Sequence, residues 1–345
     1  MYFLERPLCF GRGVKLGIVN ILVTGGAGYI GSVTVEALIA RGHDVTVLDN
    51  LSTGHLGAIH PQATFLRSDL HNVREISKAI RLGGIDAVIH FAASSLVDES
   101  MKEPIRYFDN NVVGTICLLQ AMLEQGVSRF VFSSTAALFG TGGYNPLREE
   151  APKQPTSVYG ETKHLIERIL RWLPQINDLG YTSLRYFNAA GASSTYGEDH
   201  RPETHLIPLT LQVAIGSKNS INIYGQNYDT PDGTCIRDYV HVLDLAQAHV
   251  LAIEDVRPGE VKAYNVGNGT GFSVQEVIHA CRHVTQHPIP VHLKPPRVGD
   301  PPFLVADSSR IRSELGWDPH FTDLEGIIIS AWDWHKRHPR GYGID

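Results

Sequence analysis

The stretch Thr24-Gly25-Gly26-Ala27-Gly28-Tyr29-Ile30-Gly31 decides the fold, because it follows a short apolar run and opens a segment with helical spacing. Its glycines form the pattern Thr-Gly-x-x-Gly-x-x-Gly. Such glycines permit a tight turn, close backbone approach to a pyrophosphate and close packing of helix on strand, while the helix N-terminus offers free N–H groups. We interpret the stretch as a dinucleotide cradle, with Gly25, Gly28 and Gly31 as cofactor-binding residues.

An acidic residue follows at the spacing that a dinucleotide site needs. The next predicted strand ends at Asp49, where a carboxylate can accept hydrogen bonds from both hydroxyls of an adenosine ribose. The same charge would repel a 2′-phosphate. A lone glycine fingerprint is weak evidence, but strand, glycines, helix and acid occur here in the expected order. The sequence therefore predicts NAD rather than NADP as the cofactor.

Working outward, apolar runs rich in β-branched residues alternate with helical segments, as in βαβ units. We predict an α/β fold: a doubly wound parallel Rossmann sheet with a smaller C-terminal α/β substrate domain. After about residue 188 the chain becomes polar and rich in turns. We expect an N-terminal extension of unknown role at 1–18, an NAD-binding domain at 19–188, and a substrate domain at 189–345 from which some segments return to the first. The predicted strands are 21–24, 45–48, 87–91, 130–134 and 183–186, and the helices include 32–41 and 112–125.

The amino-acid composition argues against several classes of binding partner. The 345 residues carry a net charge of −6, which argues against nucleic-acid binding and against a polybasic membrane anchor. No apolar run approaches the roughly 20 residues of a membrane span, and residues 1–18 lack the apolar core of a signal peptide, so we expect a cytoplasmic protein. The cysteines Cys9, Cys117, Cys235 and Cys281 lie far apart, as reduced thiols do.

A tyrosine and a lysine share one face of a predicted helix. Tyr159 and Lys163 are four residues apart, and they come about 25 residues after the predicted strand that ends in Phe132-Ser133-Ser134-Thr135. A neighbouring ammonium and a bound nicotinamide cation both favour the phenolate. By itself the pair is a frequent chance match. Its position beyond a strand whose hydroxyls reach the carboxyl edge of the sheet makes it a candidate proton acceptor and donor.

These motifs together resemble the extended short-chain dehydrogenase/reductase superfamily and, within it, the UDP-glucose 4-epimerases. The resemblance covers about residues 20–342. It rests on TGGAGYIG (24–31), LDN (48–50), HFAA (90–93), DNNVVGT (109–115), VFSSTA (131–136), YGETK (159–163), LRYFNAAGA (184–192), DGTCIRDYVHV (232–242) and RVGDPP (297–302).

The resemblance implies a reaction and roles for its residues. The reaction would be reversible inversion at C4 of a UDP-hexose through a 4-keto sugar. Tyr159 would be the catalytic base, Lys163 would hold the nicotinamide ribose and lower the pKa of Tyr159, and Thr135 would bind the reacting oxygen. Further cofactor contacts would be Tyr29, Ile30, Asp49, Asn50, Asp69, Leu70, Phe91, Ala92, Asn110, Ser133 and Phe187. Ser95 stands where some members have a lysine, so that contact is not carried over.

For the nucleotide sugar, the resemblance implicates Asn188, Leu206, Tyr224, Arg237, Arg297, Asp300 and Leu304. Arginine forks suit a diphosphate. From the residues alone, Arg237 could equally form an internal ion pair with Asp238, and Asp300 could cap a loop. In the family, the position of Leu304 helps set the space beside the C2 substituent of the sugar. A leucine there predicts efficient turnover of UDP-glucose and UDP-galactose and weaker turnover of the N-acetylated pair.

Two further kinds of enzyme and one binding protein are alternatives to a UDP-hexose epimerase. Epimerases of UDP-uronates or UDP-pentoses share the machinery and stay open as alternatives. A nucleotide-sugar dehydratase or reductase is disfavoured, because dehydratases of the superfamily carry an Asp-Glu pair where this chain has Ala136-Ala137. A non-catalytic dinucleotide sensor is the rival of another class, and such sensors typically lose the tyrosine and lysine.

Two further features of the sequence bear on metal binding and on self-association. His279 and His283 lie four apart on a predicted helix with His287 close behind, but no acidic or cysteine ligand has matching spacing. We therefore expect a solvated helix face and no metal. The resemblance suggests that segments 112–125 and 164–173 pair across a two-fold axis, which would make the protein a homodimer.

Overall fold

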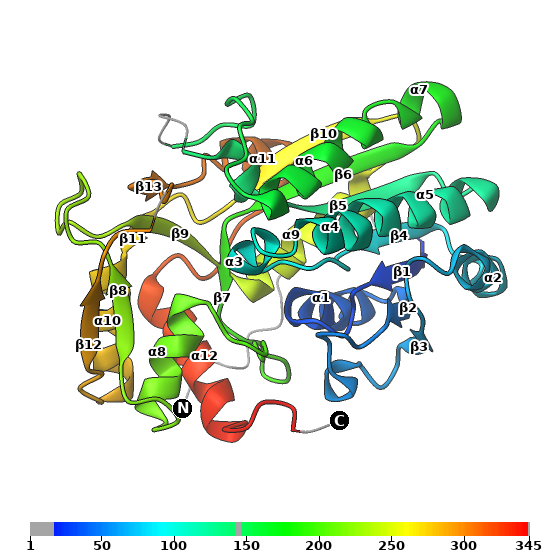
Figure 1. Ribbon diagram of the computed structural model, residues 1–345. Helices are drawn as coiled ribbons and strands as arrows, with labels where there is room; N and C mark the ends of the chain where they lie inside the picture. Colours follow the sequence, from blue (N-terminus) through cyan, green and yellow to red (C-terminus); the bar gives the residue numbers. More distant parts are fainter. Residues whose placement is uncertain (1–16, 142–145, 298, 344–345) are drawn as a thin grey trace.

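The computed structural model describes residues 17–141, 146–297 and 299–343, so most of the predicted N-terminal extension and Cys9 lie outside the described residues. A parallel sheet of seven strands forms the centre, in the order β10-β6-β5-β4-β1-β2-β3 (Figure 1). All five predicted strands are present in it, together with β3 and β10. The strands are β1 (Asn20–Thr24), β2 (Asp44–Asp49), β3 (Thr64–Arg67), β4 (Ala87–His90), β5 (Arg129–Thr135), β6 (Gly180–Tyr186) and β10 (Val261–Val266).

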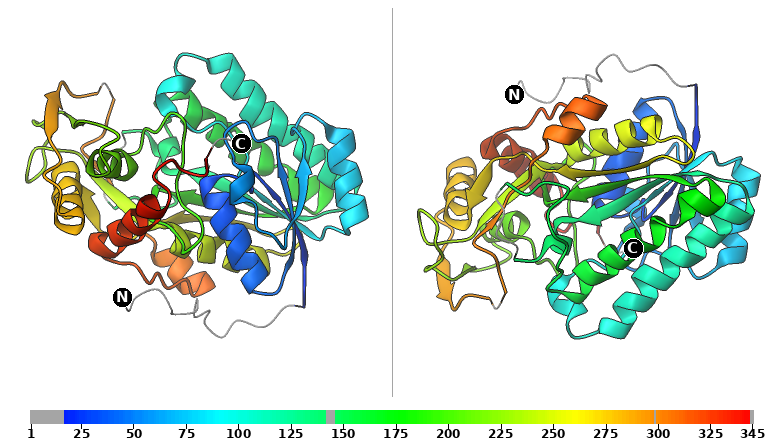
Figure 2. Two further views of the ribbon diagram at one scale, coloured as in Figure 1. Left: turned by 90° about the horizontal axis from the view of Figure 1, so that it is seen from below. Right: turned by 90° about the horizontal axis from the view of Figure 1, so that it is seen from above.

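Helices cover both faces of this sheet (Figure 2). One face packs against α1 (Tyr29–Ala40), α9 (Val242–Asp255) and α11 (Ser309–Leu315). The other packs against α2 (Val73–Gly83), α5 (Gly114–Glu124) and α6 (Val158–Leu170). The central strands read as continuous apolar runs because they are buried on both sides. The predicted doubly wound fold is confirmed.

Short elements connect these helices to the sheet. The predicted helix 112–125 is divided, because a π-helical turn, η2 (Phe108–Val113), precedes α5. The amide of Asn111 in this turn donates to the carbonyl oxygen of Ser94 (3.0 Å) and to the Thr162 hydroxyl (3.1 Å), which ties it to α6. The remaining short elements are η1 (Leu56–Ala58), α3 (Val97–Ser100), α4 (Pro104–Tyr107), η3 (Ala136–Phe139) and α7 (Leu173–Asn177).

The later part of the chain builds a second core from two small sheets and three helices. Strand β9 pairs with β11, β13 and β7, while β8 pairs with β12. The strands are β7 (Asn188–Ala190), β8 (Ile221–Tyr224), β9 (Ile236–His241), β11 (Gly271–Ser273), β12 (Val291–Lys294) and β13 (Phe303–Leu304). Helices α8 (Leu206–Ala214), α10 (Val274–Thr285) and α12 (Leu324–Arg337) enclose this core. Among the described residues, no helix is long and apolar enough to span a bilayer.

Candidate active site

The predicted catalytic residues and the glycine turn lie at the carboxyl edge of the large sheet. The last residue of β1, Thr24, lies beside Leu48 of β2 on one side and His90 of β4 on the other. Strand order reverses at β1, and ligands of doubly wound sheets bind at such a switch point. In the same way Thr135, which ends β5, lies beside Tyr186, which ends β6. The strand ends therefore place the glycine turn and the candidate catalytic residues along one edge.

The glycine turn is shaped by close backbone approaches. Gly25 has φ +74°, and a Cβ there would lie 2.5 Å from the backbone nitrogen of Ala92. A Cβ on Gly31 would clash with the carbonyl oxygen of Gly25. Gly28 precedes α1 and provides no side-chain cap, so the first N–H groups of the helix have no side-chain acceptor at this position. These free donors, together with the positive end of the helix dipole, fit a pyrophosphate.

Asp49 is held in place by two backbone donors. Its carboxylate accepts hydrogen bonds from the N–H of Ala27 (3.0 Å) and of Leu51 (2.8 Å). Burial raises the pKa of Asp49, and these two bonds and the nearby His55 oppose the rise. The side chain thus lies directly beside the glycine turn, where a ribose joined to the pyrophosphate would be bound. The turn and the acid together fit NAD.

The other residues expected near the adenosine each have a defined contact. The Asn50 amide donates to the Asp69 carboxylate (2.7 Å), although the two residues come from different strand ends. Leu70, directly after Asp69, packs against the start of α5 at Gly114. On the far side of the turn, the Tyr29 hydroxyl donates to the carbonyl oxygen of Gly191 (2.6 Å), so its phenol joins the helix to a loop of the second core. Ile30 packs into the core beneath α1.

The residues expected near the nicotinamide directly follow β4 and β6 or lie in η2. Phe91 contacts the buried ring of His249 with 4.6 Å between ring centroids. The Asn110 amide donates to Ser94 Oγ (3.3 Å) and to Asn111 Oδ1 (2.9 Å). Phe187 continues β6 and donates its N–H to the carbonyl oxygen of Val266 (3.3 Å).

Helix α6 carries the predicted tyrosine and lysine. It begins after Ser157, whose hydroxyl accepts from the N–H of Gly160 (3.1 Å). Lys163 is 2% exposed, and its Nζ donates to the carbonyl oxygen of Ser133 at 2.8 Å. The ammonium also lies 4.9 Å from the centroid of the Phe132 ring. The helix and strand β5 are therefore joined directly through this lysine.

Burial shifts the pKa of both residues. Desolvation raises the pKa of Tyr159, and a polar contact with the Thr135 side chain opposes that rise. Desolvation lowers the pKa of Lys163 to about 7. The lowering of the Tyr159 pKa by Lys163 that the resemblance implies stays a prediction. Tyr159, Thr135 and Lys163 nevertheless occupy one corner of the site.

A buried ion pair behind this corner was not anticipated. The Glu167 carboxylate on α6 accepts hydrogen bonds from Nε (2.9 Å) and Nη2 (2.7 Å) of Arg185 and from the Ser134 hydroxyl (2.6 Å). The hydroxyls of Ser133 and Tyr186 are hydrogen-bonded to each other. These bonds fix the ends of β5 and β6 against α6. Arg185 lies in the motif LRYFNAAGA (184–192), but no motif links it to Glu167, so only the three-dimensional arrangement reveals their pairing.

Several of the predicted substrate residues form one group on the second core. Arg237 of β9 pairs with Asp300, and its guanidinium also donates to the carbonyl oxygen of Pro301 (2.9 Å). Leu304 lies beside Arg237 in the β13–β9 pair and packs against the cluster that contains Phe187. The Asn188 amide donates to the carbonyl oxygen of Asp238 (3.0 Å). The ion pair with Asp238 that the sequence left open does not form, and the partner of Arg237 is Asp300.

Two other substrate candidates form a second group, and one stands apart. The guanidinium of the exposed Arg297 lies 4.2 Å from the centroid of the Tyr224 ring, in a cation–π contact at the end of β8, where Tyr224 is half-buried. Leu206 is the half-buried first residue of α8. Of the histidines on α10 that the sequence offered as possible metal ligands, His283 is exposed, and its Nε2 lies 3.9 Å from a Glu325 carboxylate oxygen.

The fold and the site define a dinucleotide-dependent enzyme of the Rossmann type. The chain belongs to the NAD dependent epimerase/dehydratase family, which matches residues 21–267. It is 52% identical over 328 residues to a UDP-glucose 4-epimerase of Halalkalibacterium halodurans, covering 94% of this chain and 98% of the relative. The resemblance inferred from the sequence motifs is confirmed.

Solved structures agree with this assignment. A crystal structure of a UDP-glucose 4-epimerase superposes on this chain with a TM-score of 0.92 at 50% sequence identity. The match covers 94% of this chain and 100% of the other. The UDP-glucose 4-epimerase from Bifidobacterium longum, solved in complex with NAD+ and UDP, has a TM-score of 0.89 at 36% identity and covers 94% and 100% of the two chains.

Proposed function

We propose that this protein catalyses the NAD-dependent, reversible 4-epimerisation of UDP-glucose and UDP-galactose through a transient 4-keto-hexose. The arrangement of Tyr159 and Thr135 at the end of β5, with Lys163 bonded to the same strand, is the observation that carries this proposal. The relatives that support it are named UDP-glucose 4-epimerase and align over nearly the full chain.

Each catalytic side chain has a distinct part. Tyr159 takes the proton of the 4-hydroxyl and later returns it, and Thr135 binds the reacting oxygen beside it. When bound, NAD supplies the acceptor and donor of the hydride that inversion at C4 requires. Lys163 holds the nicotinamide ribose and places a positive charge near the phenolate. Its bond to Ser133 keeps that ammonium in position before cofactor binds.

Two sets of residues are proposed to bind the cofactor and the substrate. The residues proposed for NAD are Gly25, Gly28, Tyr29, Ile30, Gly31, Asp49, Asn50, Asp69, Leu70, Phe91, Ala92, Asn110, Ser133, Tyr159, Lys163 and Phe187. Those proposed for the UDP-sugar are Thr135, Asn188, Leu206, Tyr224, Arg237, Arg297, Asp300 and Leu304. Arg237 and Arg297 supply the positive charge for the diphosphate, which stays bound while the 4-keto sugar turns over.

The test is direct because the cofactor is regenerated in each cycle. Purified protein is incubated with UDP-galactose and no added nucleotide, and UDP-glucose is then measured by anion-exchange chromatography. Conversion is expected without any added NAD. A protein that converts neither UDP-hexose, even with NAD supplied, does not have this activity. UDP-glucuronate and UDP-xylose in parallel reactions separate the hexose from the uronate and pentose alternatives.

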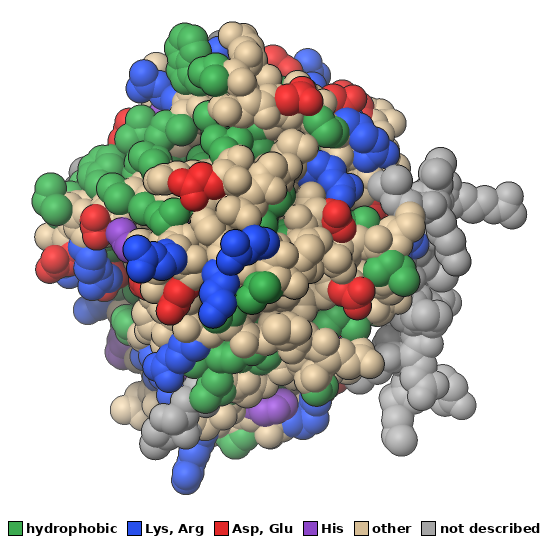
Figure 3. All heavy atoms as spheres, turned by 90° about the vertical axis from the view of Figure 1, so that its right-hand side faces the viewer, with side chains coloured by type: hydrophobic (Ala, Val, Ile, Leu, Met, Phe, Trp, Pro, Cys, Tyr) green, Lys and Arg blue, Asp and Glu red, His purple; other side chains and the backbone are tan. Residues whose placement is uncertain are grey.

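We also propose a homodimer built on α5 and α6. Large apolar side chains are exposed on this side of the molecule, and Figure 3 shows hydrophobic side chains gathered at the upper left of its view, over the face that carries these helices. Patches of this kind mark interfaces. The exposed side chains are Val97, Met101, Ile105, Val113, Ile116, Trp172 and Ile176.

Sedimentation or light scattering tests the dimer. Ile116→Glu places a charge on α5 within the patch and is expected to give a monomer. Leu82→Glu is the matched control, because Leu82 is 71% exposed at the end of α2 and should leave the dimer intact. A wild-type chain that is monomeric at micromolar concentration contradicts the proposal.

A cytoplasmic location and a lack of nucleic-acid partners are proposed on chemical grounds. Cys117, Cys235 and Cys281 are free thiols, as expected in a reducing compartment. The net charge of −6 disfavours a phosphate backbone as partner.

A further inference from the structure

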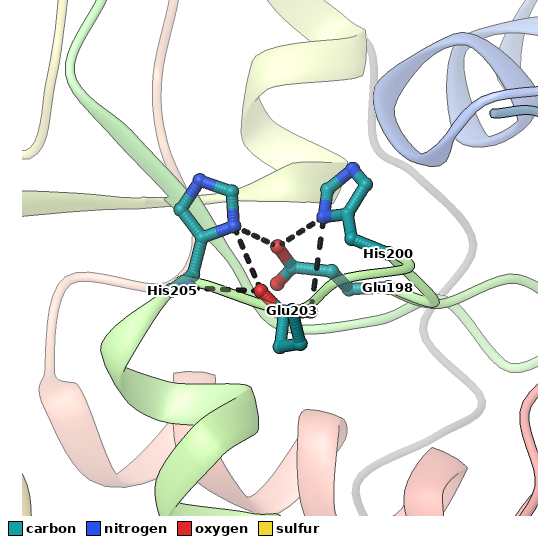
Figure 4. Close-up of side chains that lie close together, drawn as sticks. All are labelled: Glu198, His200, Glu203 and His205. Carbon is teal, nitrogen blue, oxygen red and sulfur yellow. Dashed lines mark hydrogen bonds and ion pairs between the residues drawn. The ribbon is translucent and has the colours of Figure 1, made fainter. Parts of the chain in front are cut away.

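A group of two glutamates and two histidines lies in the loop between β7 and α8. Glu198, His200, Glu203 and His205 each offer one ligand atom, and these four atoms lie within 4.8 Å of one another. Figure 4 shows all four side chains converging on one point from a single loop. In the sequence, these residues have the spacing Glu-x-His-x-x-Glu-x-His within a polar, turn-rich stretch.

The distances suit a small ion. His200 Nδ1 lies 3.1 Å from Glu198 Oε1 and 3.7 Å from Glu203 Oε2. His205 Nδ1 lies 2.7 Å from Glu198 Oε1 and 3.1 Å from Glu203 Oε1. Zinc bonds of about 2.0–2.1 Å in a tetrahedron separate their ligand atoms by about 3.4 Å. The four observed separations, which involve both oxygens of Glu203, lie on either side of that value, and one ligand atom from each residue lies within 4.8 Å of the others.

Charge balance also calls for a cation. The side chains of Glu198 and Glu203 are only 5% and 4% exposed. Within the described part of the chain, no lysine or arginine forms an ion pair with either carboxylate. Buried carboxylates without a partner are costly. The positive charge must therefore come from the histidines or from a bound ion.

Protons on both histidines are the alternative source. In that state two imidazolium rings would lie 5.2 Å apart and repel each other. A divalent ion balances the two carboxylates with both imidazoles neutral, and it removes this repulsion.

We infer that Glu198, His200, Glu203 and His205 bind one divalent transition-metal ion. Two imidazole nitrogens and two carboxylate oxygens are donors that zinc accepts in tetrahedral sites, so zinc is the expected occupant. The Glu203 carboxylate is already oriented, because it accepts from the N–H groups of Thr204 (2.7 Å) and His205 (2.8 Å).

The ion would have a structural task at the border of the active site. The ring of His200 lies edge-on to Tyr29 of the glycine turn, with 6.2 Å between centroids. His205 immediately precedes Leu206, where α8 begins. A metal clip would hold this loop between the cofactor cradle and the second core. Hydride transfer needs no metal, so the ion takes no part in the proposed reaction.

Metal content provides the test. The full chain, without a histidine tag, is purified in metal-free buffer and measured by inductively coupled plasma mass spectrometry. About one zinc per chain is expected, and less than about a tenth of that in the double variant His200→Ala/His205→Ala. The matched control is His279→Ala/His283→Ala, which removes two exposed helical histidines and should keep the metal. Metal retained in the first variant, or lost in the control, overturns the assignment.

A measurement on the wild-type chain decides the matter if the double variant does not fold. A strong chelator is added, and the melting temperature is expected to fall by about 5 °C and to recover when zinc is restored, because a ligand of the native state stabilises it. Wild-type protein that holds no metal and shows no thermal shift with excess zinc has an ion-pair cluster at this place, and the inference is then wrong.

Discussion

The Nζ atom of Lys163 donates a hydrogen bond to the carbonyl oxygen of Ser133 at 2.8 Å. This bond joins the helix that carries the candidate base to the strand that carries the candidate hydroxyl. This hydrogen bond keeps the Nζ atom of Lys163 beside the reaction site, and burial lowers the pKa of Lys163 to about 7. Cofactor binding would then meet a site whose geometry is already set.

The first prediction concerns the base. Tyr159→Phe removes the proton acceptor and keeps the ring, so turnover of UDP-galactose should fall at least about a hundredfold while folding and NAD content persist. Tyr181→Phe is the control, because Tyr181 lies at the opposite end of β6 and should retain activity. Near-normal turnover in Tyr159→Phe would exclude the assigned mechanism.

The second prediction concerns cofactor choice. The Asp49 carboxylate would lie close to any 2′-phosphate, and like charges at short range in a partly buried site cost several kcal/mol. Denatured wild-type protein should therefore release NAD, identified by chromatography. In Asp49→Asn the preference for NAD over NADP should shrink by more than about tenfold, and in Asp44→Asn, at the exposed start of β2, it should not change. Release of NADP from the wild-type chain would contradict the assignment.

The third prediction concerns acid stability. His90 bridges the hydroxyls of Thr24 (2.6 Å) and Thr115 (2.8 Å), and burial together with the charge of Lys163 lowers its pKa to about 3. Between pH 6.5 and that value the unfolded chain binds a proton here and the folded chain does not. The free energy of unfolding should therefore decrease as pH falls through this window, with His90 contributing about 1.4 kcal/mol per pH unit.

Urea titrations between pH 7 and 4.5 measure this contribution. In His90→Gln the slope of unfolding free energy against pH should be smaller than in wild type by about that amount, whatever the overall loss of stability. His279→Gln changes an exposed histidine and should keep the wild-type slope. Equal slopes in wild type and His90→Gln would mean that His90 is not buried as a neutral ring.

The central strands were predictable because burial on both faces makes them continuous apolar runs. The edge strands gave a weaker signal: β3 consists of Thr64, Phe65, Leu66 and Arg67, of which none is buried. Strand β10 likewise begins with exposed and half-buried residues. The division of the predicted helix 112–125 by a π turn depends on bonds from Asn111 to other elements, which no local pattern contains.

In the site, residues with a local motif were predictable and pairings across the chain were not. The glycine turn and Tyr159 with Lys163 are each defined within eight residues of sequence. By contrast, Arg237 pairs with Asp300, 63 positions away, rather than with its neighbour Asp238. The Asp238 carboxylate is instead saturated by backbone N–H groups of three distant residues, Asn268, Gly269 and Ala306.

The last prediction concerns the sugar. Leu304 lies beside Arg237 in the β13–β9 pair and packs with the cluster around Phe187, which places it between the proposed diphosphate and nicotinamide contacts. Its side chain is smaller than tyrosine and larger than cysteine, so it should narrow the space beside the C2 substituent without closing it. UDP-glucose and UDP-galactose should then be favoured over their N-acetylated counterparts, which still turn over, by roughly one to two orders of magnitude in kcat/KM. Leu304→Tyr should reduce turnover of the N-acetylated pair further and spare the other pair. Leu293→Tyr, at an exposed position of β12, is the control. If the Leu304→Tyr protein treats N-acetylated sugars as well as wild type does, Leu304 does not line the sugar pocket.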